Sequence, residues 1–132
     1  MESLAYATHM HHQYAHVSRF TIFVQGDPYE HAPKYLFDNV LQSLRTNTYT
    51  VPFLHLNSRR FLSGNSYCLQ DMYSRLFQTG EIPEAFGSYC CSQFVVHRDR
   101  ILARPQEFYK RIVQYLMGEL PFGCAQDTSY DP

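Results

Sequence analysis

The sequence has little charge, no tryptophan and no long apolar run. Charged residues make up 17% of the 132 positions, and 11 basic against 12 acidic side chains leave a formal net charge of −1. Because no strong positive field remains, the composition argues against a nucleic-acid scaffold and against binding to anionic lipid. Polar residues interrupt every hydrophobic segment before it reaches the roughly 18 residues of a membrane span, so no span is expected.

No secretory signal peptide is expected at the amino-terminal end of this sequence. Residues 1–15 contain one acidic residue and three histidines where a signal would need about 7–15 apolar residues. The four cysteines also lack the spacing of a disulfide framework or of a zinc site, since Cys90 and Cys91 are adjacent. We therefore expect reduced thiols, with Cys90 and Cys91 on opposite faces of one strand, and an intracellular location.

Several common catalytic motifs are missing as well. No Gly-x-Ser-x-Gly, no phosphate-binding glycine-rich loop and no dinucleotide fingerprint occurs, so serine hydrolase, kinase and dehydrogenase interpretations have no basis. What the chain does have is 45% hydrophobic residues, with 16% aromatic. This composition excludes disorder and suffices for one compact domain.

Helical and strand-like patterns alternate along the chain. Apolar residues at helical spacing predict helices over residues 2–15, 33–47, 69–77, 98–102 and 105–118. Runs rich in β-branched and aromatic residues predict strands over 19–25, 49–56 and 89–96, with a loop over 57–65.

The first strand, RFTIFVQ, is apolar at nearly every position. Such a run favours a strand buried on both faces, as in a parallel sheet. The alternating order predicts a single α/β domain of Rossmann-like type, with helices packed on a small, mostly parallel sheet. We expect this domain to cover residues 1–118 and an irregular tail to cover 119–132.

The segment after the first strand is the first place where chemistry is expected, because α/β sheets bind ligands beyond the carboxyl ends of their strands. Asp27, Glu30 and His31 follow that strand and would suit a magnesium or manganese ion or a sugar hydroxyl. An equally weighted alternative is a Gly-Asp-Pro turn, with Asp27 capping the chain and His31 capping the next helix.

Arginines follow the third strand. Arg98, Arg100 and Arg104 fall within seven residues, near predicted helix starts, where a phosphate or diphosphate would bind. For any single arginine, an ion pair with Asp99 on a solvated face is the favoured interpretation.

The histidines give weaker signals. His9, His12 and His16 share one helical face, but no acidic residue joins them as in helical zinc motifs, so metal binding is the less favoured interpretation. His55 lies alone on a predicted strand and is expected to be structural.

Three segments carry a resemblance to a known family: Glu2-Ser3-x-x-Tyr6 with the helix that follows, TIFVQGDPYEH at 21–31 and CCSQFVVHRDRILARPQEFY at 90–109. Through them, residues 2–117 resemble an uncharacterised family common in fungi, domain of unknown function 3431. That family is distantly similar to GT-A-type nucleotide-sugar glycosyltransferases. The similarity implies a metal-binding acid at Asp27, and an acceptor or phosphate side lined by the Gln93 strand and Arg98.

Two hypotheses follow. The first is a glycosyltransferase-like domain that binds a nucleotide sugar with Mn²⁺ or Mg²⁺, in which Asp27 and His31 are catalytic and Asp27 and Glu30 hold the metal. Its expected substrate-binding residues are Gln25, Gln93, Arg98, Arg100 and Arg104. The second is a non-catalytic domain that has lost the nucleotide-binding half and binds carbohydrate or a protein through exposed Tyr and Phe.

Overall fold

The chain forms short helices and strands that alternate. The computed structural model describes residues 2–57, 60–63, 67–89 and 91–121. The elements are α1 (Glu2–His12), the 3-10 turn η1 (Tyr14–His16), β1 (Phe20–Phe23), α2 (Lys34–Arg45), β2 (Phe53–His55), β3 (Arg60–Ser63), α3 (Tyr67–Phe77), β4 (Phe86–Tyr89), β5 (Phe94–His97), α4 (Arg98–Leu102) and α5 (Gln106–Leu116). Part of the predicted tail, residues 122–132, lies outside the described residues.

The main sheet has three strands in the order β1-β5-β2. Both outer strands pair antiparallel with β5: Phe20 lies opposite His97, and Phe53 lies opposite Val96. The expected mostly parallel, Rossmann-like sheet is therefore wrong, although the α/β character is confirmed. β1 and β2 do run in the same direction, but β5 lies between them with the opposite direction.

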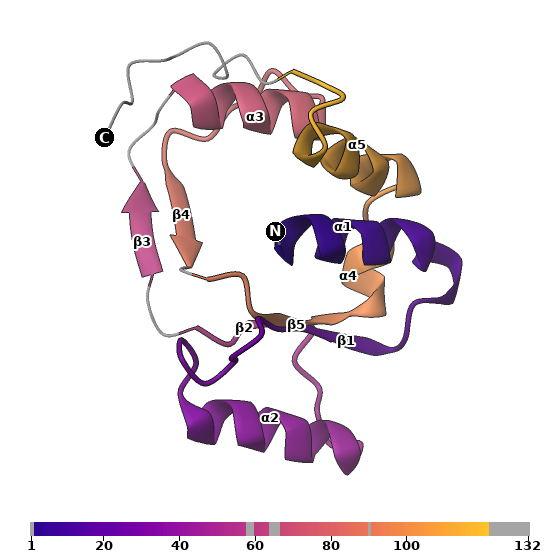
Figure 1. The fold of residues 1–132 in the computed structure, drawn as a ribbon, viewed down its shortest axis with the longest axis vertical. Helices are drawn as coiled ribbons and strands as arrows, with labels where there is room; N and C mark the ends of the chain where they lie inside the picture. The colour runs from indigo at the N-terminus through magenta and orange to yellow at the C-terminus, as the bar shows by residue number, and fades with distance from the viewer. Residues whose placement is uncertain (1, 58–59, 64–66, 90, 122–132) are drawn as a thin grey trace.

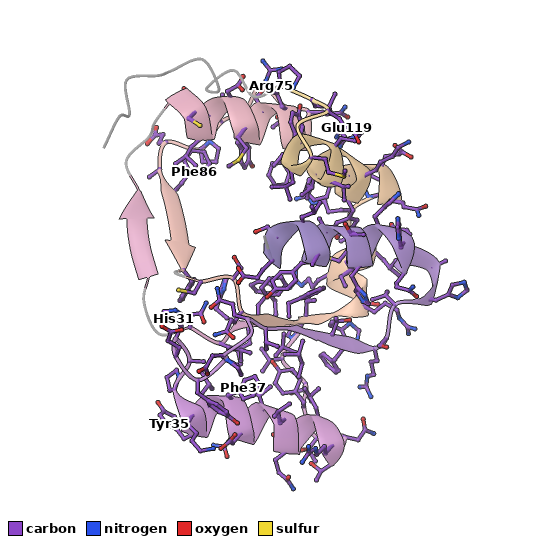
Figure 2. The ribbon with its side chains drawn as sticks, in the orientation of Figure 1. His31, Tyr35, Phe37, Arg75, Phe86 and Glu119 are labelled. Atoms are coloured by element: carbon purple, nitrogen blue, oxygen red, sulfur yellow. The ribbon has the colours of Figure 1, made fainter. Side chains whose placement is uncertain are left out.

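Helices cover both faces of this sheet, with α2 on one side and α1 on the other (Figure 1). On the α2 side, Phe37 and Val40 pack with Leu56 and Val95 in one buried cluster, and Figure 2 shows Phe37 pointing from α2 toward the sheet. Burial on two faces explains why β1 is apolar at successive positions. The apolar run of β1 therefore indicates burial on both faces and does not indicate whether the strand pairs parallel or antiparallel.

The second cluster lies on the opposite face. It joins Phe23 of β1 and Val96 of β5 to Ile101 of α4 and Tyr109 of α5. The Tyr109 hydroxyl donates to the carbonyl of Ile101 at 2.7 Å, which fixes α5 against α4. Tyr6 of α1 packs against this cluster, so α1, α4 and α5 share one side of the sheet.

A separate two-stranded sheet pairs β3 with β4 in antiparallel register. The sequence predicted a loop over 57–65 and one strand over 89–96, and both predictions are wrong. The predicted strand is divided by a bend at Cys91, which has a φ of 60°. A left-handed residue interrupts a β ladder, so β4 and β5 join different sheets.

Two of the four cysteines differ from expectation. Cys68 and Cys91 are disulfide-bonded, so the prediction of reduced thiols is wrong for both, and the argument from thiols to an intracellular location loses its basis. Cys91 lies in a bend and not in a strand, while Cys90 and Cys124 lie outside the described residues. Within the described ranges, no helix has the length and apolar character needed to cross a bilayer.

Candidate functional site

A buried amide network lies where β1 and β2 end and β5 begins. Gln93 is 0% exposed. Its Oε1 accepts from the backbone N–H of Gln25 at 3.2 Å, and its Nε2 donates to the Pro28 carbonyl at 3.2 Å and to Asn57 Oδ1 at 3.0 Å. One side chain thus joins the segment after β1 to the segment after β2. Gln93 fixes this end of the sheet.

The predicted acidic site is built as a turn. Asp27 Oδ1 accepts from the Tyr29 N–H at 3.2 Å, and the Glu30 N–H donates to the Asp27 carbonyl at 3.4 Å. His31 Nε2 lies 3.8 Å from a Glu30 carboxylate oxygen, and Figure 2 places His31 in the loop before α2. This geometry confirms the Asp27 part of the alternative interpretation, a turn capped by Asp27. The His31 part is wrong, because α2 begins after Pro33 with no side-chain cap.

Among the described residues, the segment around Asp27 does not contain a group of side chains arranged to bind a metal ion. In the part of the chain that the structure describes, no group of three His, Cys, Asp or Glu side chains is placed to hold a metal ion, and this covers the His9, His12 and His16 face. Mn²⁺ or Mg²⁺ at Asp27 and Glu30 stays a prediction.

The arginines lie at the opposite end of the sheet. Because β5 is antiparallel to β1, Gln93 precedes β5 near Phe23, whereas Arg98 follows it and donates its N–H to the Arg19 carbonyl at 2.9 Å. Four strand residues separate the two ends by about 10 Å or more. Arg100 is exposed and the Arg104 guanidinium lies 4.9 Å from the Phe77 ring centroid. The structure therefore brings Gln25, Asp27, His31 and Gln93 to one end of the sheet. None of these three arginines lies at that end.

A different set of residues forms a contiguous ring surface, which we call the aromatic shelf: Phe53, His55, Tyr89 and Phe94. The His55 ring stacks on Tyr89 with centroids 4.2 Å apart and also contacts Phe53 at 4.9 Å. Phe94 lies 5.5 Å from Phe53 and 6.4 Å from His55. Phe53 is 43% exposed and Tyr89 is 40% exposed, so two of the four rings face solvent.

Strand register explains why these rings gather. Phe53 and His55 are two positions apart on β2 and share one face of the sheet. His55 lies opposite Phe94 of β5, and Phe94 lies opposite Phe23 of β1. Tyr6 of α1 covers the β1 end of this row, with its ring 4.7 Å from Phe23 and 6.1 Å from Phe94. The β2 end carries the exposed ring of Phe53.

Three buried polar atoms on this face of the sheet have no hydrogen-bond partner among the described residues: Tyr6 Oη, Thr21 Oγ1 and His55 Nδ1. Thr21 shares the face because it precedes Ile22, which packs on the α2 side. Buried side-chain polar atoms are nearly always hydrogen-bonded, to protein, water or a ligand.

Burial sets the protonation of two of these groups. Desolvation lowers the pKa of His55 below its ordinary value, which favours the neutral imidazole near pH 7. Desolvation, with a smaller contribution from the Glu2 carboxylate, raises the pKa of Tyr6, so its hydroxyl keeps the proton. The shelf thus combines ring faces with a neutral imidazole, and the protonated phenol of Tyr6 packs on its Phe94 ring.

Sequence reasoning missed this site. His55 was interpreted as structural because it stood alone along the chain, and Phe53, Tyr89 and Phe94 were not singled out. The F-L-H alternation at 53–55 was the available signal, because it places Phe53 and His55 on one face. The contribution of Tyr89 from a second sheet had no such signal.

Comparison with known proteins identifies a family, but no individual relative and no similar solved structure. A family model described as a protein of unknown function (DUF3431) matches residues 54–121, just over half of the chain. Neither the curated proteins nor the solved structures contain a match. The matched region includes His55, Tyr89, Gln93 and Phe94.

Proposed function

The chain belongs to the DUF3431 family of proteins of unknown function, and for this member we propose that the aromatic shelf binds carbohydrate. The observation that carries the proposal is the pair of exposed rings of Phe53 and Tyr89, which are joined through the His55 ring that each of them contacts.

A pyranose ring matches this combination of groups. Sugars with equatorial hydroxyls present apolar C–H faces, which pack on aromatic rings, and a rim of hydroxyls that both donate and accept hydrogen bonds. Rigid aromatic side chains supply such contact area at low cost in conformational entropy. We therefore assign the exposed rings of Phe53 and Tyr89 to stacking on the sugar. β-1,4-linked glucose or N-acetylglucosamine chains are the ligand class with the required flat faces.

A transfer reaction is not part of this proposal. The sequence-based glycosyltransferase hypothesis needed an acid and arginines around one cleft. Asp27 lies in a turn at one end of the sheet, and Arg98 and Arg100 follow β5 at the other end. The separation favours the binding hypothesis over nucleotide-sugar transfer.

Calorimetric titration with cellotetraose and with chitotetraose tests the proposal. We expect saturable binding of at least one of them, weakened about tenfold by Phe53→Ala or by Tyr89→Ala because each removes one stacking ring. Tyr35→Ala is the matched control, since Tyr35 is 72% exposed on α2, on the opposite side of the sheet. Absence of binding at millimolar sugar, or equal losses in all three variants with their folds intact, would contradict the proposal.

A further inference from the structure

The outer edge of β2, beside the aromatic shelf, carries backbone groups that point away from the sheet. In an antiparallel pair, residues whose N–H and C=O face the partner strand alternate with residues whose N–H and C=O face away from it. The His97 N–H donates to the Pro52 carbonyl at 2.8 Å, so position 52 faces β5, and by this alternation Leu54 does as well. The backbone groups of Phe53 and His55 therefore point outward.

This edge is open at Phe53. Among the described residues, β2 pairs with β5 alone, and no hydrogen bond reaches the Phe53 N–H. Val51, Pro52 and Phe53 are all exposed, whereas Leu56 and Asn57 beyond the other end of β2 are buried. The residue that presents an exposed ring to a ligand thus also presents an unpaired backbone donor.

Within the proposed carbohydrate site, and resting on that proposed function, we propose that the ligand is a chain of N-acetylated sugars. The pyranose stacks on the Phe53 ring, and the acetamido carbonyl of the same sugar accepts a hydrogen bond from the Phe53 N–H. Of the two ligand classes with flat faces, this assigns β-1,4-linked N-acetylglucosamine in preference to β-1,4-linked glucose.

An acetamido group matches an open strand edge in its chemistry. It is a planar secondary amide with a carbonyl acceptor, like the peptide groups of a neighbouring strand. Extended peptides bind exposed sheet edges through the same backbone hydrogen bonds.

Reach distinguishes this group from a sugar hydroxyl. The Phe53 side chain stands roughly perpendicular to the sheet, whereas its N–H lies close to the plane of the sheet. A sugar stacked on the ring must therefore extend a substituent toward the backbone. The acetamido oxygen lies three bonds from the pyranose ring and a hydroxyl oxygen lies one bond from it, so the acetamido group is the better fit. One such hydrogen bond changes affinity about three- to tenfold.

The test compares the dissociation constants of cellotetraose and chitotetraose for the wild type and two variants. We expect the wild type to bind chitotetraose at least threefold more tightly. Phe53→Pro removes both the ring and the N–H, and proline is tolerated on an edge strand where the N–H faces outward. Phe53→Ala is its matched control, since it removes the ring and keeps the N–H. Both variants should bind more weakly, but Phe53→Ala should keep the threefold preference and Phe53→Pro should lose it.

Amide hydrogen exchange of the wild type reads the same contact without a substitution, and it decides the question if Phe53→Pro does not fold. The Phe53 N–H should exchange at least fivefold more slowly in saturating chitotetraose than in saturating cellotetraose. The Leu54 N–H is the internal control, because it faces Val95 of β5 and should exchange equally slowly with either sugar.

A wild-type preference below threefold, a preference that persists in Phe53→Pro, or equal exchange of the Phe53 N–H in the two sugars would overturn the role of the strand edge. Each of these results would leave carbohydrate binding at the shelf intact. Failure of the wild type to bind either sugar would instead overturn the proposed function itself, so the two failures are distinguishable.

Discussion

The imidazole of His55 lies parallel to the phenol of Tyr89, with ring centroids 4.2 Å apart and planes inclined by 20°. This stack joins β2 of the three-stranded sheet to β4 of the two-stranded sheet. It is therefore part of the proposed binding surface and also a packing contact between two parts of the fold.

Folding stability should depend on the protonation of His55. Its pKa is lowered by burial, so below the ordinary value of about 6.5 the unfolded chain binds a proton more readily than the folded chain. The contribution of neutral His55 to the free energy of unfolding is therefore fully present above that value and is lost as the pH drops below it. Urea denaturation at pH 7.5 and pH 5.5 measures the effect. In His55→Phe the difference should shrink, and an unchanged difference would contradict the burial argument.

Gln93→Leu should destabilise the protein by about 2–4 kcal/mol. The leucine fills a similar volume but leaves the Gln25 N–H, the Pro28 carbonyl and Asn57 without the hydrogen bonds that Gln93 makes. Urea denaturation gives the change in the free energy of unfolding. The matched control is Gln42→Leu at an exposed position of α2, which should change it by less than about 0.5 kcal/mol. Equal effects would contradict the role of the amide network.

The sequence predicted helices better than strand direction. The helices over 33–47 and 105–118 are confirmed as α2 and α5 to within two residues at each end. Proline precedes both helices, and left-handed residues follow them, Asn47 at φ 57° and Gly118 at φ 76°. The sheet was misjudged because burial on both faces gives the same apolar run in parallel and antiparallel strands. Direction depends on which strands pair, and this pairing is non-local.

The candidate site was harder still to predict. Asp27 was selected because it follows a predicted strand, and Gln93 because the family resemblance implied a role for its strand. The structure does bring their segments together. Arg98 was placed beside them only because the sheet was assumed to be parallel. The aromatic shelf combines β2, β4 and β5, and Tyr89 reaches it through the bend at Cys91, which no periodic pattern in the sequence marks.

Tyr109→Phe should lower stability by about 1 kcal/mol at neutral pH, because it removes the hydrogen bond to Ile101. Burial raises the pKa of Tyr109 to about 12, so between about pH 10 and 12 the unfolded chain ionises first and the wild type loses stability as the pH rises. The variant should lose less over this interval. Denaturation at pH 9 and 11.5, with Tyr35→Phe as the exposed control, checks this, and parallel losses in all three proteins would contradict it.

Reduction should destabilise the protein. Cys68 and Cys91 each take part in a disulfide bond, and the loss of a native disulfide generally costs about 2–4 kcal/mol. Thermal unfolding with and without dithiothreitol should show a lower Tm in the reduced sample. Peptide mapping after alkylation is the control: both cysteines should be labelled only after reduction. Labelling of either one in the unreduced, folded protein would contradict the assignment.

The most direct test of carbohydrate binding at the aromatic shelf is a chemical-shift map of the ¹⁵N-labelled protein titrated with cellotetraose and chitotetraose. The proposal predicts saturable shifts in the backbone amides of β2, β4 and β5 around Phe53, His55, Tyr89 and Phe94, with α2 unaffected. Shifts confined to the loop of Asp27 or to the Arg98–Arg104 segment would favour the transferase hypothesis instead. No shifts at millimolar concentrations of either sugar would contradict carbohydrate binding altogether.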